Sequence, residues 1–157
     1  MKKILLGLCA LSVLYATSCK KKDDDGGSVD KKSTLTTGKW QLTGANMSYS
    51  FAGQNQNVDI YSTFYQACER DNYYFFAANG TATMDEGATK CDSGDPQTSD
   101  AGAWQLLNND TQLKCNIDGA EQTFDITSFN SSGMTLTIET NYMGATAKQN
   151  MILTHIN

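Results

Sequence analysis

The chain has 157 residues, and its fractions of hydrophobic (39%), aromatic (10%) and charged (18%) residues are those of one ordinary globular domain. From residue 38 onward it has five Lys and Arg but thirteen Asp and Glu, a net charge of −8. Nucleic-acid-binding domains are usually basic, so this acidic surplus argues against a nucleic-acid partner.

Residues 1–18 have the pattern of a secretion signal. Two lysines precede an apolar run over 4–15, which is too short to span a bilayer comfortably as a permanent helix. The small residues Ala, Thr and Ser at 16–18 precede Cys19, and this arrangement resembles the lipobox of bacterial lipoproteins. The resemblance implies that Cys19 is diacylated on its sulfur and becomes the new N-terminus. The alternative is a soluble secreted protein that is cut nearby.

Residues 19–37 are rich in Lys, Asp, Gly, Ser and Thr and contain almost nothing apolar. This composition cannot bury enough surface to offset the entropy of ordering the chain, so we expect a lipidated, flexible tether that attaches the protein to a membrane. Lys20, directly after the cysteine, resembles lipoproteins sorted to the outer membrane. The basic-acidic run 20–25 resembles an export tag of surface lipoproteins in some Gram-negative bacteria. The alternative is a solvated linker that carries no sorting signal.

Beyond the tether, short runs alternate apolar and polar residues and are separated by Asn-Gly, Asp-Gly and Ser-Gly turns, which is a strand pattern. We count eight strands, a number that suits an all-β, antiparallel up-and-down β-barrel. The predicted strands are 39–50, 72–77, 81–86, 101–107, 111–117, 121–129, 133–140 and 146–154.

The turn at 78–80 can be a two-residue loop or a three-residue loop with its glycine in the left-handed conformation. Only the three-residue loop places Tyr74 opposite Met84 and Phe76 opposite Ala82 on one apolar face. We therefore expect the three-residue loop.

The turn at 118–119 is predicted to have two residues. In that register, the apolar residues of the strand before the turn share one face with those of the strand after it. These residues are expected to point inward: Leu113, Cys115, Ile117, Phe124 and Ile126.

In an up-and-down order, alternate connections lie at opposite ends of the barrel. The two long connections, 52–71 and 87–100, therefore share one end, which is the candidate binding mouth. Val58, Tyr61 and Tyr65 follow helical spacing in the first connection and predict a short helix across this mouth. The helix is either a mobile lid or a plug that completes the core.

Three cysteines remain if the signal is removed and Cys19 is lipidated, and they lie in an oxidising compartment. Cys68 and Cys91 lie in the two long connections at the same barrel end, so we expect a disulfide between them. Cys115 is the rival partner, but it alternates with apolar residues and is expected to be a buried thiol.

A Gly-x-Trp pattern at 38–40 opens the folded part and recurs at 102–104. With the two cysteines of the long connections, Asp71, a Phe-containing strand and a Gly turn between them, it resembles the lipocalin-like domains of Gram-negative lipoproteins. The resemblance covers 38–157 and implies a lipocalin-like barrel and the same disulfide. Larger lipocalins also place an Arg from a late strand against the first tryptophan, and this chain has no Arg after Arg70.

Signals for catalysis are poor. The single histidine, His155, is two residues from the C-terminus, and no Ser-His-Asp order or Cys/His metal spacing is present. We therefore expect a protein that is not an enzyme and holds no metal or cofactor.

Two function classes remain. The first is a barrel that binds a small apolar or amphipathic molecule in its interior. The second is a solid barrel that acts through its long-loop end, by docking an envelope protein or inhibiting an enzyme. We expect a monomer in both cases. The candidate interior residues are Trp40, Tyr74, Phe76, Met84, Trp104, Phe124, Ile126 and Leu136.

Overall fold

The computed structural model describes residues 29–117, 119–142 and 144–157. The expected signal 1–18 and the lipidation site Cys19 lie outside these residues. Two short helices accompany ten strands: α1 (Lys31–Leu35), β1 (Lys39–Phe51), β2 (Gln54–Asp59), α2 (Ile60–Phe64), β3 (Tyr73–Phe76), β4 (Thr81–Asp85), β5 (Thr98–Ala103), β6 (Gln105–Leu107), β7 (Gln112–Asn116), β8 (Glu121–Asn130), β9 (Gly133–Tyr142) and β10 (Ala145–Ile156).

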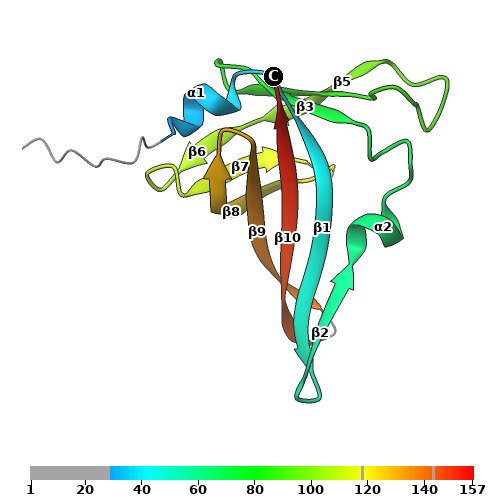
Figure 1. Ribbon diagram of the computed structural model, residues 1–157, viewed down its shortest axis with the longest axis vertical. Coiled ribbons are helices and arrows are strands. Elements are labelled where there is room, and N and C mark those ends of the chain that lie inside the picture. The colour runs from blue at the N-terminus through cyan, green and yellow to red at the C-terminus, as the bar shows by residue number, and fades with distance from the viewer. Residues whose placement is uncertain (1–28, 118, 143) are drawn as a thin grey trace, which may run out of the picture.

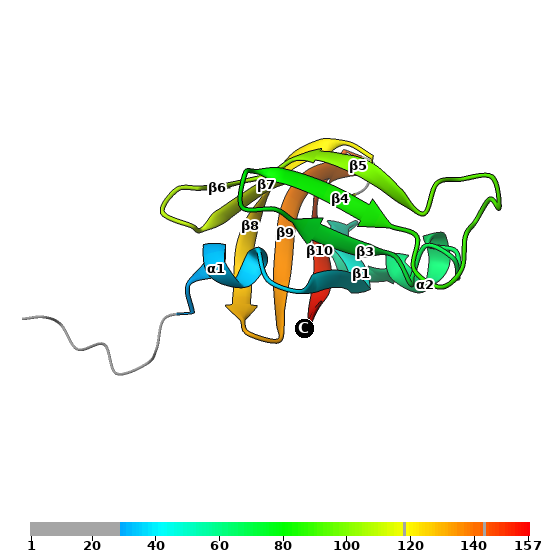
Figure 2. The same ribbon diagram turned by 90° about the horizontal axis from the view of Figure 1, so that it is seen from above.

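The strands form one antiparallel sheet in the order β5-β4-β3-β1-β10-β9-β8-β7-β6, and β2 pairs with the far half of β1 (Figure 1). Strands joined by short connections are mostly neighbours in the sheet, as expected for antiparallel hairpins. The first long strand, β1, pairs with the last strand, β10. The sheet is strongly curved and wraps around its own apolar face (Figure 2).

The sequence predicted eight strands, and the structure has ten. One additional strand is β2, which forms because Ala52 and Gly53 both have positive φ angles, of 50° and 75°, and reverse the chain in a two-residue turn. The other arises because the predicted strand 101–107 is divided at Trp104 into β5 and β6.

The expected closed barrel is also wrong. Among the described residues β5 pairs only with β4, and β6 pairs only with β7, so the hydrogen-bonded ladder is interrupted between them. The physical reason lies at Trp104, whose backbone N–H donates to the carbonyl oxygen of Gly80 at 2.8 Å. Gly102, with a φ of 81°, bends the chain just before this point. The two edge strands β5 and β6 are thus joined by the covalent chain at Trp104 and not by a continuous ladder of backbone hydrogen bonds.

Both predicted turn registers are confirmed. Tyr74 lies opposite Met84 and Phe76 opposite Ala82, and Gly80 has a φ of 89°, as the three-residue loop requires.

At the second turn, Leu113 lies opposite Phe124 and Asn116 opposite Glu121. This register places the apolar residues of β7 and β8 on the inner face. Asp118, the first residue of the predicted turn, lies outside the described residues.

The curved sheet encloses one apolar core, to which both tryptophans belong. Trp40 is fully buried and Trp104 is 6% exposed, which confirms the expected burial of both. The other large side chains that are fully buried are Phe124, Leu35, Leu113, Leu136, Met151, Leu153 and Cys115.

The folded region begins before residue 38. Asp30 caps α1, its side chain accepting hydrogen bonds from the backbone N–H groups of Lys32 and Ser33 at 3.1 and 3.2 Å. Leu35 is fully buried, and its carbonyl oxygen accepts a hydrogen bond from Trp40 Nε1 at 3.2 Å. Residues 31–35, expected as part of the flexible tether, are therefore folded onto the core, because one buried leucine anchors them. Among the described residues no helix is long and apolar enough to cross a membrane.

The far parts of β1, β9 and β10, together with β2, extend beyond the core as an arm, away from α1 and the C-terminus (Figure 1). On one face of the arm and the adjoining strands, polar side chains form a hydrogen-bonded row across four strands. Thr127 Oγ1 lies 3.0 Å from Thr137 Oγ1, Thr137 donates to Asn150 Oδ1 at 2.8 Å, and Asn150 donates to Asn46 Oδ1 at 3.0 Å. The opposite face of the arm carries its apolar residues.

Candidate functional site

The residues predicted to line the interior mostly form the core. Six of the eight are buried: Trp40, Tyr74, Phe76, Trp104, Phe124 and Leu136. Met84 and Ile126 are partly buried and pack against them. Side chains thus fill this part of the interior, as a sheet of this size permits.

His155 lies beside the first tryptophan, Trp40. Its ring stacks on Trp40 with 4.6 Å between ring centroids. Nε2 lies 2.7 Å from the carbonyl oxygen of Thr37, and Nδ1 lies 2.9 Å from that of Ser131. The single histidine therefore connects the segment before β1, the β8–β9 turn and the core. This role could not be predicted from the sequence, because a lone histidine near a terminus has no motif around it.

The long connections do share one end of the sheet, and a disulfide joins them there. The bond between Cys68 and Cys91, with Cα atoms 5.2 Å apart, confirms the expected pairing. Cys115 is the buried free thiol that was also expected. Burial raises the pKa of Cys115 to about 12, so its reactive thiolate form is strongly disfavoured at neutral pH.

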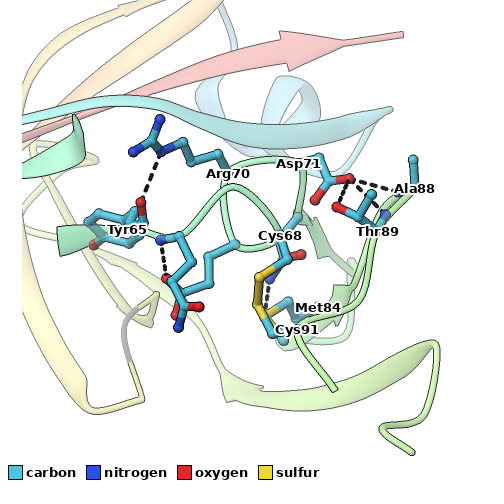
Figure 3. Close-up of a disulfide and its surroundings, with 11 residues drawn as sticks. Tyr65, Cys68, Arg70, Asp71, Met84, Ala88, Thr89 and Cys91 are labelled. Carbon is cyan, nitrogen blue, oxygen red and sulfur yellow. Dashed lines mark hydrogen bonds between the residues drawn. A yellow bond between two sulfur atoms is a disulfide. The ribbon is translucent and has the colours of Figure 1, made fainter. Parts of the chain in front are cut away.

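Asp71 forms a second link between the same connections (Figure 3). Its Oδ2 accepts hydrogen bonds from Ala88 N at 3.1 Å and from the backbone N–H and hydroxyl of Thr89, both at 2.8 Å. Gly87 passes so close to Asp71 that an added Cβ would lie 2.2 Å from the Asp71 carbonyl oxygen, and its φ is 68°. Only glycine fits this position without strain.

A cleft of about 400 Å³ opens at this end, between the clamped connections and the inner sheet. Its apolar surface comes from the inner faces of β1, β3 and β4 and from residues beside them: Leu42, Tyr65, Tyr74, Met84 and Ile117. Cys91, one half of the disulfide, also lines it. A smaller hollow of about 250 Å³ shares Tyr74, Met84 and Ile117 with the cleft. We call the larger hollow the mouth cleft.

The mouth cleft is acidic. Three carboxylates line it: Glu69 and Glu86, which are half-buried, and Asp95, which is exposed. Glu69 Oε2 accepts a hydrogen bond from Gln66 N at 2.6 Å, which fixes its position. No Lys, Arg or His is among the described residues that line the cleft. The lining itself therefore has a negative net charge, which favours a positively charged group. Two cations lie beside it: Lys90 donates to the carbonyl oxygen of Asp95 at 2.6 Å, and Arg70 donates to that of Tyr65 at 3.0 Å.

The expected helix exists as α2, but it packs beside β1 and does not move freely over the cleft. Ile60 is buried, and the Tyr61 hydroxyl donates to the carbonyl oxygen of Leu42 at 3.0 Å. Arg70 holds the end of the helix by donating to the carbonyl oxygens of Ser62 and Tyr65 at 2.9 and 3.0 Å. These bonds favour the plug over the mobile lid.

The start of α2 is capped by Asp59. Its side chain accepts hydrogen bonds from the hydroxyl and the backbone N–H of Ser62 at 2.6 and 3.1 Å, and these bonds hold the pKa of Asp59 below its usual value. Val58, which the helical spacing included, lies in β2, and Tyr65 is the C-cap.

A second hollow, of about 390 Å³, lies on the apolar face of the arm, which we call the arm groove. Met47 and Val58 form part of its floor, and Phe64 and Tyr65 from α2 and its end form a wall. Tyr65 lines both the arm groove and the mouth cleft, so its side chain separates the two hollows. The arm groove could not be predicted from the sequence, because it depends on β2, which was itself not predicted.

Among the described residues, no group of three or more His, Cys, Asp or Glu side chains is arranged to hold a metal ion.

No family model matches the chain, and no curated protein matches it. The solved structures to which the chain is similar include the crystal structure of a lipocalin-like protein from Bacteroides uniformis ATCC 8492. The identity is 17%, the match covers 78% of this chain and 99% of that chain, and the TM-score is 0.40. A likeness of this degree is too low to support an argument about function.

Proposed function

We propose that this chain is a non-enzymatic lipoprotein of the cell envelope that binds a small amphipathic, positively charged molecule in the mouth cleft. The interior is filled by side chains, so the binding place is the cleft and not a central cavity. The single observation that supports the proposal best is the cleft itself, which combines an apolar surface with three carboxylates in about 400 Å³. Small-molecule sites commonly combine apolar walls with a few polar groups in this way.

The clamp around the cleft supports binding to a preformed site. The Cys68–Cys91 disulfide and the bonds of Asp71 hold both long connections in place before any ligand arrives. A preformed cleft binds with a smaller entropic cost than one that must be ordered by its ligand.

The location is part of the same proposal. The lipobox-like residues before Cys19 and the basic residue after it support attachment to the outer membrane, with exposure at the cell surface as the further expectation. Replacement of Cys19 by Ser should move the protein from the membrane to the soluble fraction. The anchor proposal fails if Cys19→Ser still partitions with membranes.

Binding can be tested with two amphiphiles of equal chain length and opposite charge, dodecyltrimethylammonium and dodecyl sulfate. Calorimetric titration below their micellar concentrations should detect binding of the cation only. The double substitution Glu86→Gln and Asp95→Asn should weaken that binding by about tenfold, since each exposed or half-exposed charge pair contributes up to about 1 kcal/mol.

The matched control is the double substitution Glu121→Gln and Glu139→Gln, which removes the same charge from exposed positions outside the cleft. This control should retain the affinity of the unchanged protein. Equal loss in both double variants would show that only net charge matters, and the cleft would then not be the site.

The second candidate function is a solid domain that docks an envelope protein through its long-loop end. The specific observation in its favour is the burial of Trp40, Phe124 and Leu136, with exposures of 0 to 2%, where a hollow binding barrel would leave space. Absence of binding for both amphiphiles would favour this candidate.

A further inference from the structure

The strand β2 forms a free edge of the sheet. It pairs with β1 on one side, from Asn46 opposite Asp59 to Phe51 opposite Gln54, and no other described strand pairs with it. A free edge presents backbone N–H and C=O groups that another strand can bind.

The hairpin geometry determines which groups face outward. In a two-residue turn with both central φ angles positive, the residues that close the turn form a hydrogen-bonded pair. Phe51 and Gln54 close this turn and form such a pair. Along the rest of the ladder, residue pairs that exchange backbone hydrogen bonds with each other alternate with residue pairs that do not. Asn55 and Asn57 therefore direct their N–H and C=O groups away from β1, toward the free edge.

The edge has few of the features that commonly protect such strands, and its one charged residue is Asp59 at the end of β2. Natural edge strands are guarded by charges, especially Lys, by Pro or by bulges. The stretch Gln54–Val58 is uncharged and contains no Pro, and its ladder with β1 has no register shift. Because this segment is neutral, it can pair with an identical copy without placing like charges directly opposite each other.

Exposed aromatic rings flank both ends of the edge. Phe51, just before the turn, is 54% exposed, and Phe64, at the end of α2, is 71% exposed. Alternation along β1 places Phe51 on the same face as Met47, and Phe64 and Met47 both line the arm groove. Both rings therefore lie on the apolar side of the arm, Phe51 just before β2 in the chain and Phe64 after it.

We propose that β2 pairs with β2 of a second copy, antiparallel about a two-fold axis at Gln56, and forms a symmetric dimer with a continuous sheet. In this register Asn55 lies opposite Asn57 of the partner copy, so the outward backbone groups of each bind those of the other. Asp59 lies opposite Gly53 of the partner copy, and the two Asp59 carboxylates stay apart. Gln and Asn side chains each have a hydrogen-bond donor and an acceptor, so those of one copy can also hydrogen-bond to those of the other copy.

The same symmetry accounts for the exposed aromatic rings. Antiparallel pairing brings the turn of one copy, which follows Phe51, toward α2 of the other copy, which ends in Phe64. The contact is made twice, once on each side of the axis. Two rings that are exposed in the single chain are thereby brought toward each other, and this adds apolar burial to the backbone bonds.

The register predicts a specific cross-link. Gln56 is opposite its own copy in a pair without backbone hydrogen bonds, where Cα atoms are about 4.5 Å apart, and a disulfide can span that distance. Gln56→Cys in the full-length chain, expressed in cells with its own leader, should give a disulfide-linked dimer on a non-reducing gel. The free thiol Cys115 is buried and should not contribute.

The control for the cross-link is Thr146→Cys, an exposed position of β10 away from the free edge. It should give no dimer under the same conditions. Equal cross-linking at both positions, or none at position 56, would overturn the proposal, as would a disulfide from position 56 to a different protein.

A second variant tests the association without a cross-link. Gln56→Lys places two positive charges directly opposite each other across the axis and should convert the dimer to a monomer in sedimentation equilibrium. Thr146→Lys adds the same charge elsewhere on the arm and should leave the dimer intact. A monomer for the unchanged full-length protein, at concentrations where the Gln56→Cys chain cross-links, would show that collisions alone form the link and would overturn the proposal.

Discussion

At the scale of single residues, His155 shows how one side chain can connect distant segments of the chain. Its ring stacks on Trp40 with 4.6 Å between ring centroids. Its two nitrogens reach the carbonyl oxygens of Thr37 and Ser131, which belong to segments far apart in the sequence. The contact therefore fastens the start and the end of the folded chain around the first tryptophan.

His155→Ala should lower the free energy of unfolding by about 1 to 3 kcal/mol, because the ring stack and the polar contacts of the ring nitrogens with the carbonyl oxygens of Thr37 and Ser131 are lost. Chemical denaturation monitored by tryptophan fluorescence measures this change. His155→Phe retains a ring over Trp40 but has no ring nitrogen for these contacts, so its loss should be smaller than that of His155→Ala. Equal losses in the two variants would show that stacking contributes nothing.

At the scale of elements, the strands with clear alternation were predicted well and the irregular ones were not. The register of the β3–β4 hairpin followed from matching Tyr74 and Phe76 to apolar partners. In contrast, β2 has one apolar residue, Val58, so it has no alternation to detect. It forms because a left-handed turn at Ala52 and Gly53 returns the chain alongside β1.

Helix α1 was missed for a similar reason, since five residues with one leucine have no periodic pattern. Its composition predicted a flexible tether, and the burial of Leu35 overrides that local tendency. The candidate site was likewise predictable only in part. The disulfide could be predicted from topology, but the acidic cleft depends on how the two long connections fold back, which no local pattern encodes.

Leu35→Ala should destabilise the protein by about 2 to 5 kcal/mol, because it removes a fully buried side chain and leaves a cavity beside Trp40. Ser33→Ala, at an exposed position of the same helix, should change stability by less than about 0.5 kcal/mol. Thermal or denaturant unfolding of both variants measures the difference. If Leu35→Ala is as mild as its control, α1 belongs to the tether after all.

At the scale of the whole molecule, the strands follow one another in the order of an up-and-down barrel, but the ladder of backbone hydrogen bonds does not close. The predicted eight strands correspond to β1, β3, β4, β5 with β6, β7, β8, β9 and β10. The interruption at Trp104 could not be predicted, because 101–107 reads as one alternating run. The interruption depends on a tertiary contact. Trp104 Nε1 donates to the carbonyl oxygen of Ala77 at 2.9 Å, and this bond draws the chain toward the β3–β4 turn.

The stability of the sheet should therefore be uneven around its circumference. β1 lies between β10 on one side and β2 and β3 on the other, so its backbone groups are bonded on both sides over much of its length. β5 and β6 are each bonded on one side only among the described strands. Segments with fewer bonds open locally at lower free energy, and hydrogen exchange detects such openings.

Trp104→Phe should increase amide exchange in β5 and β6 by about fivefold, because it retains an aromatic ring but removes one hydrogen bond, which is worth about 1 kcal/mol. Trp40→Phe is the matched control, since it removes the indole bond to the Leu35 carbonyl oxygen, at a distance from β5 and β6. Peptide-resolved exchange by mass spectrometry separates the two effects. In both the unchanged protein and Trp104→Phe, the ladder between β1 and β10 should exchange more slowly than β5 and β6, because it exchanges only when the whole protein unfolds. Equal exchange rates in β1, β10, β5 and β6 would mean that the sheet opens as one unit and that the interruption at Trp104 has no separate role.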